Sequence, residues 1–122
     1  MTSTTTELSL DEIFNLAKAA LINNGANEEN ADAVANTVTN AERDGSVSHG
    51  LFRIPGYVKA LKSNKVDGSA KPEIEEVTPT IFRCDARNGF APIAHKYGLE
   101  KLIKAAHTFG IAGLAIQRCH HF

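Results

Sequence analysis

The hydrophobic pattern of this sequence changes near residue 64, and the change limits the folds that the chain can adopt. Apolar residues between positions 9 and 63 recur at the spacing of amphipathic helices. Beyond position 64, short β-branched runs flank one long helical stretch. We therefore predict an α/β fold, in which an N-terminal helical hairpin precedes the start of a mixed sheet.

This change of pattern also predicts how the chain is divided. Residues 1–8 are rich in Thr and are expected to form a disordered tail. Residues 9–63 are expected to form a helical segment that carries a substrate-site helix. Residues 64–122 then form the β/α/β start of a core, which we expect to be incomplete at its C-terminal end.

Both expected N-terminal helices carry start and stop signals. Ser9 followed by Glu12 is a capping-box sequence, and Gly25 is a typical helix stop. A second helix is predicted to begin near Asn27 and to end before Gly45. Two neighbouring helices with apolar stripes should pack as a hairpin.

A third helical pattern begins after the hydroxyl-rich residues 46–48, which could cap it. On an ideal wheel of about 100° per residue, His49, Arg53 and Tyr57 lie within about 80° of one another, away from the apolar stripe. Pro55 requires that the regular helix either begins near it or bends there.

The second half of the sequence predicts strands. Glu73 to Val77 and Thr80 to Asp85 are expected to pair as a hairpin, with Asn88-Gly89 ending the second strand. A helix from Phe90 to Thr108 and a buried strand from Ile111 to Ile116 follow. Because no covering element follows this strand, we expect the sequence to be a fragment.

Length and charge exclude several classes of protein. A chain of 122 residues forms at most one compact domain, and its formal charge of −1 gives no basic surface for nucleic acid. No apolar stretch approaches the ~20 residues of a membrane span, and no signal peptide is recognisable, so we predict a cytoplasmic protein without a membrane partner. Cys84 and Cys119 are expected to be reduced thiols.

Ser48, His49, Arg53 and Tyr57 form the strongest candidate site. A guanidinium binds a carboxylate through two hydrogen bonds, and an imidazole exchanges protons near neutral pH. Such a set suits a small carboxylate substrate. The alternative is that His49 only caps or packs at a helix start while Arg53 is an ordinary exposed residue.

The remaining histidines suggest other roles. His120 and His121 lack a third ligand at a metal-binding spacing, so no metal site is predicted, and their place after a strand favours a substrate or cofactor contact. His95 is expected to be a packing residue and His107 to favour the end of a helix dipole. The residues from Gly110 to Gly113 do not form a Rossmann fingerprint.

The stretch from Arg43 to Tyr57, RDGSVSHGLFRIPGY, strongly resembles the signature of the type 2 malate/L-lactate dehydrogenase family. Four shorter motifs look most like the branch of that family that reduces Δ1-piperideine-2-carboxylate and Δ1-pyrroline-2-carboxylate. They are Val66-Asp67-Gly68, Asn88-Gly89-Phe90-Ala91, Gly110-Ile111-Ala112 and His120-His121-Phe122. Family members are longer than this chain.

The resemblance implies a non-Rossmann fold that forms homodimers and uses NADPH to reduce cyclic imino acids to L-pipecolate or L-proline. By the same resemblance, His49 would protonate the imine nitrogen and Arg53 would hold the substrate carboxylate. Ser48 and Tyr57 would line the site. His120 would lie near substrate and nicotinamide, and His121 would contact the cofactor.

Two other functions stay open at this point. A keto-acid dehydrogenase of the same family would use the same His49 and Arg53 on malate or lactate. The chain could also be a non-catalytic product of a truncated gene. We expect the 122-residue chain alone to be inactive, because most of the nucleotide-binding region would lie beyond Phe122.

Overall fold

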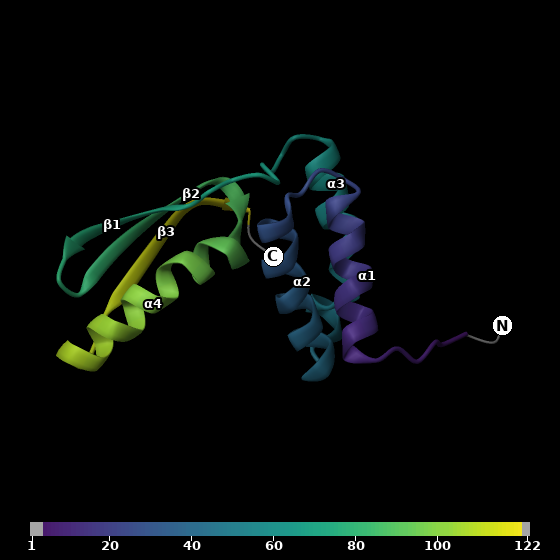
Figure 1. Cartoon of the computed structure of the whole chain (residues 1–122), viewed down its shortest axis with the longest axis horizontal. Coiled ribbons are helices and arrows are strands. Elements are labelled where there is room, and N and C mark those ends of the chain that lie inside the picture. Colours follow the sequence, from purple (N-terminus) through teal and green to yellow (C-terminus); the bar gives the residue numbers. More distant parts are fainter. Residues whose placement is uncertain (1–3, 121–122) are drawn as a thin grey trace.

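A computed structural model describes residues 4–120 of the chain (Figure 1). Its helices and strands are α1 Leu10–Ile22, α2 Glu28–Arg43, the 3₁₀ turns η1 Val47–His49 and η2 Leu51–Arg53, α3 Ile54–Lys62, β1 Glu73–Thr78, β2 Ile81–Phe90, α4 Ala91–Phe109 and β3 Gly113–His120. Helices α1, α2 and α3 form one group at the end of the sheet, and α4 lies along a face of the sheet (Figure 1). The predicted α/β class is confirmed.

The N-terminal helices begin where the capping signals predicted. Ser9 Oγ accepts the N–H of Glu12 at 3.1 Å, and Glu12 Oε1 accepts the N–H of Ser9 at 3.1 Å. Asn27 caps α2 by accepting the N–H of Asn30 at 3.0 Å. Helices α1 and α2 pack against each other, so the helical hairpin is confirmed. Residues 4–8 of the predicted tail are exposed and belong to no helix or strand.

The segment after α2 differs from the regular helix that we predicted. It forms two successive 3₁₀ turns that meet at Gly50, and the Ser46 side chain makes no capping hydrogen bond. Pro55 lies in the first turn of α3, where a missing N–H costs nothing. Of the two alternatives at Pro55, the start of the helix is therefore the observed one.

The helical part holds the larger core of the described residues. Alanines on α1 and α2 let the helices approach closely, and larger side chains fill the space between them. The buried members of this core are Ala17, Leu21, Ala26, Ala31, Val34, Ala35, Val38, Tyr57, Ala60, Leu61, Val66 and Phe90. Phe90 comes from the end of β2 and joins the sheet to the helices.

The sheet has the order β1-β2-β3 and is mixed, as predicted. Strands β1 and β2 form the expected antiparallel hairpin, and β3 lies parallel to β2. The prediction that Asn88-Gly89 ends the second strand is wrong. Arg87 and Asn88 adopt positive φ angles of 51° and 64°, which form an irregularity, and pairing resumes between Gly89 and Cys119.

Strand β3 also differs from its prediction. It runs from Gly113 to His120 instead of from Ile111 to Ile116, and its residues are half-buried or exposed. Helix α4 covers one face, where Cys84 and Ala86 pack against Ala94. The other face carries ion pairs such as Arg118–Asp85 and so stays in contact with water.

Within residues 4–120, no helix has both the length and the apolar character needed to cross a bilayer. Cys84 and Cys119 are free thiols.

Candidate active site

Ser48 links the two principal site residues. A hydrogen bond of 3.1 Å joins Ser48 Oγ and His49 Nδ1, and Arg53 Nε donates to the Ser48 carbonyl oxygen at 2.8 Å. His49 and Ser48 are exposed and Arg53 is half-buried. The structure thus brings an imidazole and a guanidinium together around one serine, although they lie on two separate turns.

The space beside this group is shallow. Ser48 lines a hollow of about 420 Å³ together with Glu42, Val47 and Phe52. His49 and Arg53 do not line it. His49 is exposed and Arg53 is half-buried, so both side chains can be reached from the surface of this chain.

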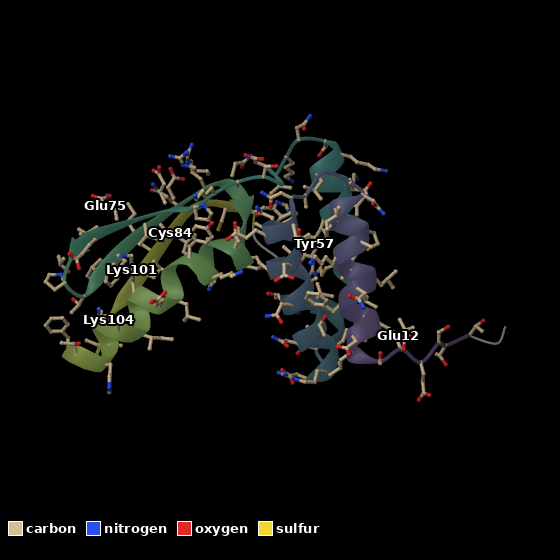
Figure 2. All side chains as sticks on the ribbon, in the orientation of Figure 1. Glu12, Tyr57, Glu75, Cys84, Lys101 and Lys104 are labelled. Atoms are coloured by element: carbon tan, nitrogen blue, oxygen red, sulfur yellow. The ribbon has the colours of Figure 1, made fainter. Side chains whose placement is uncertain are left out.

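Tyr57 does not share the polar face that the helical wheel predicted. Its side chain is only 3% exposed, and its ring packs edge-to-face on Phe90 with centroids 5.5 Å apart. The wheel assumed one continuous helix from residue 46, whereas the two 3₁₀ turns shift the register before α3 begins. Figure 2 shows Tyr57 within the helical part of the chain.

Burial changes what Tyr57 can do chemically. It raises the pKa of the phenol to about 12, and the nearby charge of Arg53 offsets only part of this effect. The hydroxyl therefore stays protonated near neutral pH.

His120 reaches the same region from the other end of the chain. It is half-buried at the end of β3, with its ring centroid 6.5 Å from Tyr57 and 5.7 Å from Phe90. The three rings meet edge to face where β2, β3 and α3 converge. His121 lies outside the described residues.

The other histidines are separate from this cluster. His95 was expected to be a packing residue, but it is exposed and lines a groove between α2 and α4. His107 lies in the last turn of α4 as predicted. In the part of the chain that the structure describes, no three His, Cys, Asp or Glu side chains are grouped to hold a metal ion.

Sequence reasoning missed two residues at this site. Phe90 was predicted only as the first residue of a helix and as part of a family motif, yet it is fully buried against Tyr57 and His120. Its place between a strand and a helix was the available signal. Glu42 accepts the N–H of Leu51 at 2.8 Å, and no sequence pattern indicated that long-range contact.

Comparison with known proteins identifies the family. The sequence profile described as malate/L-lactate dehydrogenase matches residues 8–122. The chain belongs to this family. A Delta(1)-pyrroline-2-carboxylate reductase of Ancylobacter novellus is 45% identical over 115 residues, which are 94% of this chain and 34% of that protein.

Solved structures of the family have the same fold. The delta1-piperideine-2-carboxylate reductase of Pseudomonas syringae superposes with a TM-score of 0.93 at 42% identity, covering 97% of this chain and 36% of that one. A malate dehydrogenase of Entamoeba histolytica gives a TM-score of 0.88 at 29% identity, over 98% and 33% of the two chains. The chain therefore spans about a third of the length of the relatives that it matches.

Proposed function

We propose that this chain is part of a longer enzyme that uses NADPH to reduce Δ1-piperideine-2-carboxylate and Δ1-pyrroline-2-carboxylate to L-pipecolate and L-proline. The observation that carries the proposal is the hydrogen-bonded group of Ser48, His49 and Arg53, in a chain 45% identical to a reductase of this kind. The coverage of only 34% of that relative supports the view that other parts of the enzyme complete the site.

Each side chain of the group has a role that its chemistry allows. Arg53 binds the substrate carboxylate: within residues 4–120 its Nε donates to Ser48, and its terminal guanidinium nitrogens can make charge-assisted bonds to a carboxylate. His49 gives a proton to the imine nitrogen, with its ring oriented by Ser48 through Nδ1. Tyr57 acts from the core, where its ring supports His120.

The residues near His120 fit the nicotinamide end of the cofactor. Phe90 and His120 lie together at the carboxyl ends of two parallel strands, which is where open α/β sheets commonly bind ligands. A bound nicotinamide would supply the hydride. We assign His120 to both substrate and cofactor contact, and His121 to cofactor contact.

A keto-acid dehydrogenase is the second candidate, since the malate dehydrogenase of Entamoeba histolytica shares the fold at a TM-score of 0.88. The two functions differ in the bond that is reduced. We would replace the matching third of the Pseudomonas syringae reductase with this chain and assay the chimaera with NADPH. Turnover of the cyclic imines is expected, whereas a clear preference for pyruvate or oxaloacetate would support the dehydrogenase.

The same proposal includes a cytoplasmic enzyme that acts as a homodimer on small imino or keto acids, without nucleic acid or membrane partners. It also predicts that the 122-residue chain alone is inactive. Steady turnover of cyclic imines by the purified chain would contradict this part of the proposal. A chimaera that folds but reduces neither substrate class would instead favour the non-catalytic alternative.

A further inference from the structure

The junction between the two 3₁₀ turns lacks a local cap. The turns meet at Gly50, and neither of their cap residues, Ser46 and Gly50, makes a side-chain capping hydrogen bond. The N–H of Leu51, at the start of η2, therefore needs an acceptor from elsewhere. An unsatisfied N–H here would leave the orientation of the second turn weakly determined.

Glu42, in the last turn of α2, supplies that acceptor. Its Oε1 accepts the Leu51 N–H at 2.8 Å, and its side chain is half-buried against the junction. Gly50 makes this approach possible, because a Cβ at Gly50 would lie only 2.5 Å from Glu42 Cδ and 2.8 Å from Cγ. The carboxylate occupies the space that any other residue at position 50 would fill.

The junction connects directly to the proposed site. The Gly50 carbonyl oxygen accepts the N–H of Arg53 at 3.0 Å, and the Ser48 carbonyl oxygen accepts Arg53 Nε at 2.8 Å. His49 is the last residue of η1, and Arg53 is the last of η2. The orientation of η2 relative to η1 therefore sets the spacing between the imidazole and the guanidinium.

We propose that Glu42 is a positioning residue that holds His49 and Arg53 at their working separation, and that Gly50 is required for its carboxylate to reach Leu51. This inference rests on the proposed roles of His49 and Arg53. Glu42 acts through the backbone of the turn that carries Arg53 and itself touches no substrate. A residue that only anchored the end of α2 would affect stability without affecting the rate.

The test uses the chimaeric enzyme with Glu42→Ala and Glu42→Gln. Because small misplacements of reacting groups are costly, we expect Glu42→Ala to lower kcat/KM about 10- to 100-fold. Glu42→Gln retains an acceptor oxygen for Leu51 and should recover most of the activity. Equal losses in the two variants, or no loss in Glu42→Ala, would overturn the proposal.

Glu29→Ala is the matched control. Glu29 also lies on α2 and also accepts one long-range hydrogen bond, from Tyr97 Oη at 3.0 Å, but on the side that faces α4. It should lower thermal stability about as much as Glu42→Ala and leave kcat/KM unchanged. A matching fall in activity for Glu29→Ala would reduce the role of Glu42 to ordinary stabilisation and contradict the proposal.

A measurement on the 122-residue chain separates this inference from the proposed function. Amide exchange at Leu51 should accelerate about tenfold in both Glu42→Ala and Gly50→Ala, and no further in the double variant, because each removes the same hydrogen bond. Unchanged exchange at Leu51 would contradict the Glu42 contact even if the chimaera reduces imines. If exchange at Leu51 accelerates but the chimaera is inactive on every substrate, the proposed function is rejected instead.

Discussion

The helical part and the sheet part of this chain hold buried apolar clusters of different size. In the helical part, Ala17 and Leu21 of α1 are fully buried against α2 and α3. In the sheet part, Ile103 and Phe109 of α4 are 59% and 56% exposed. Leu16 and Phe52 of the helical part are also exposed, at 54% and 75%. The difference therefore lies in the buried clusters, of which the larger is in the helical part and the smaller is where α4 packs on the sheet.

This contrast also separates the parts of the proposed site. His49 and Arg53 are supported by the well-packed helical part, through Glu42 and Ser48. His120 lies at the end of the more exposed sheet. Phe90 connects them, because it is buried in the helical core and contacts the His120 ring.

The largest expected loss of stability comes from removing the Phe90 ring that connects the two parts. Phe90→Ala should lower the free energy of unfolding by about 3–5 kcal/mol, because a fully buried ring leaves a cavity between the two parts. Phe109→Ala is the matched control and should change stability by less than about 0.5 kcal/mol. Denaturant unfolding of the chain checks both values. Equal losses of unfolding free energy in the two variants would contradict the difference between the two parts.

A smaller loss of stability is expected when Asn30 is replaced. Its side chain connects α2 to the segment before β1 by hydrogen bonding. This fully buried side chain donates to Asn27 Oδ1 at 2.9 Å and to the Ala70 carbonyl oxygen at 3.0 Å. Asn30→Ala should cost about 1–3 kcal/mol by leaving buried polar groups unpaired. Asn36→Ala, at an exposed position on the same helix, serves as the control and should be nearly neutral in thermal unfolding.

The smallest expected change is in stability at low pH, and it comes from the sheet face that α4 does not cover. Hydrogen bonds from the Arg118 side chain, followed by the backbone N–H of Arg87, lower the pKa of Asp85 from 3.8 to about 2. Since the folded state has the lower pKa, this contribution is present above about pH 4 and is lost as the pH falls toward about 2. In Arg118→Ala, the Asp85 midpoint should rise toward 3.8 in a carboxyl NMR titration; an unchanged midpoint would exclude the pairing.

The sequence predicted local features better than long-range ones. Ser9 and Glu12 form the expected capping box because both partners lie within one helical turn. Tyr57 was misplaced because periodicity alone does not reveal the change from 3₁₀ to α geometry after Gly50. The residues Asn88-Gly89 were interpreted as a strand end, since a β irregularity uses the same positive-φ residues as a turn.

In the candidate site, too, the local contacts could be predicted from the sequence and the long-range contacts could not. The pairing of His49 with Arg53 followed from short spacing, and Ser48 joins them in the structure. The contact of Glu42 with Leu51, and the meeting of Phe90, Tyr57 and His120, depend on tertiary packing. No local pattern encodes those contacts.

Steady-state kinetics of His49→Ala and Arg53→Ala in the chimaeric enzyme test the central claim most directly. If His49 donates the proton, its removal should lower kcat about 10²- to 10⁴-fold. If Arg53 binds the carboxylate before and during reaction, its loss should mainly raise KM for the cyclic imine. Unchanged kcat and KM in both variants would contradict the account.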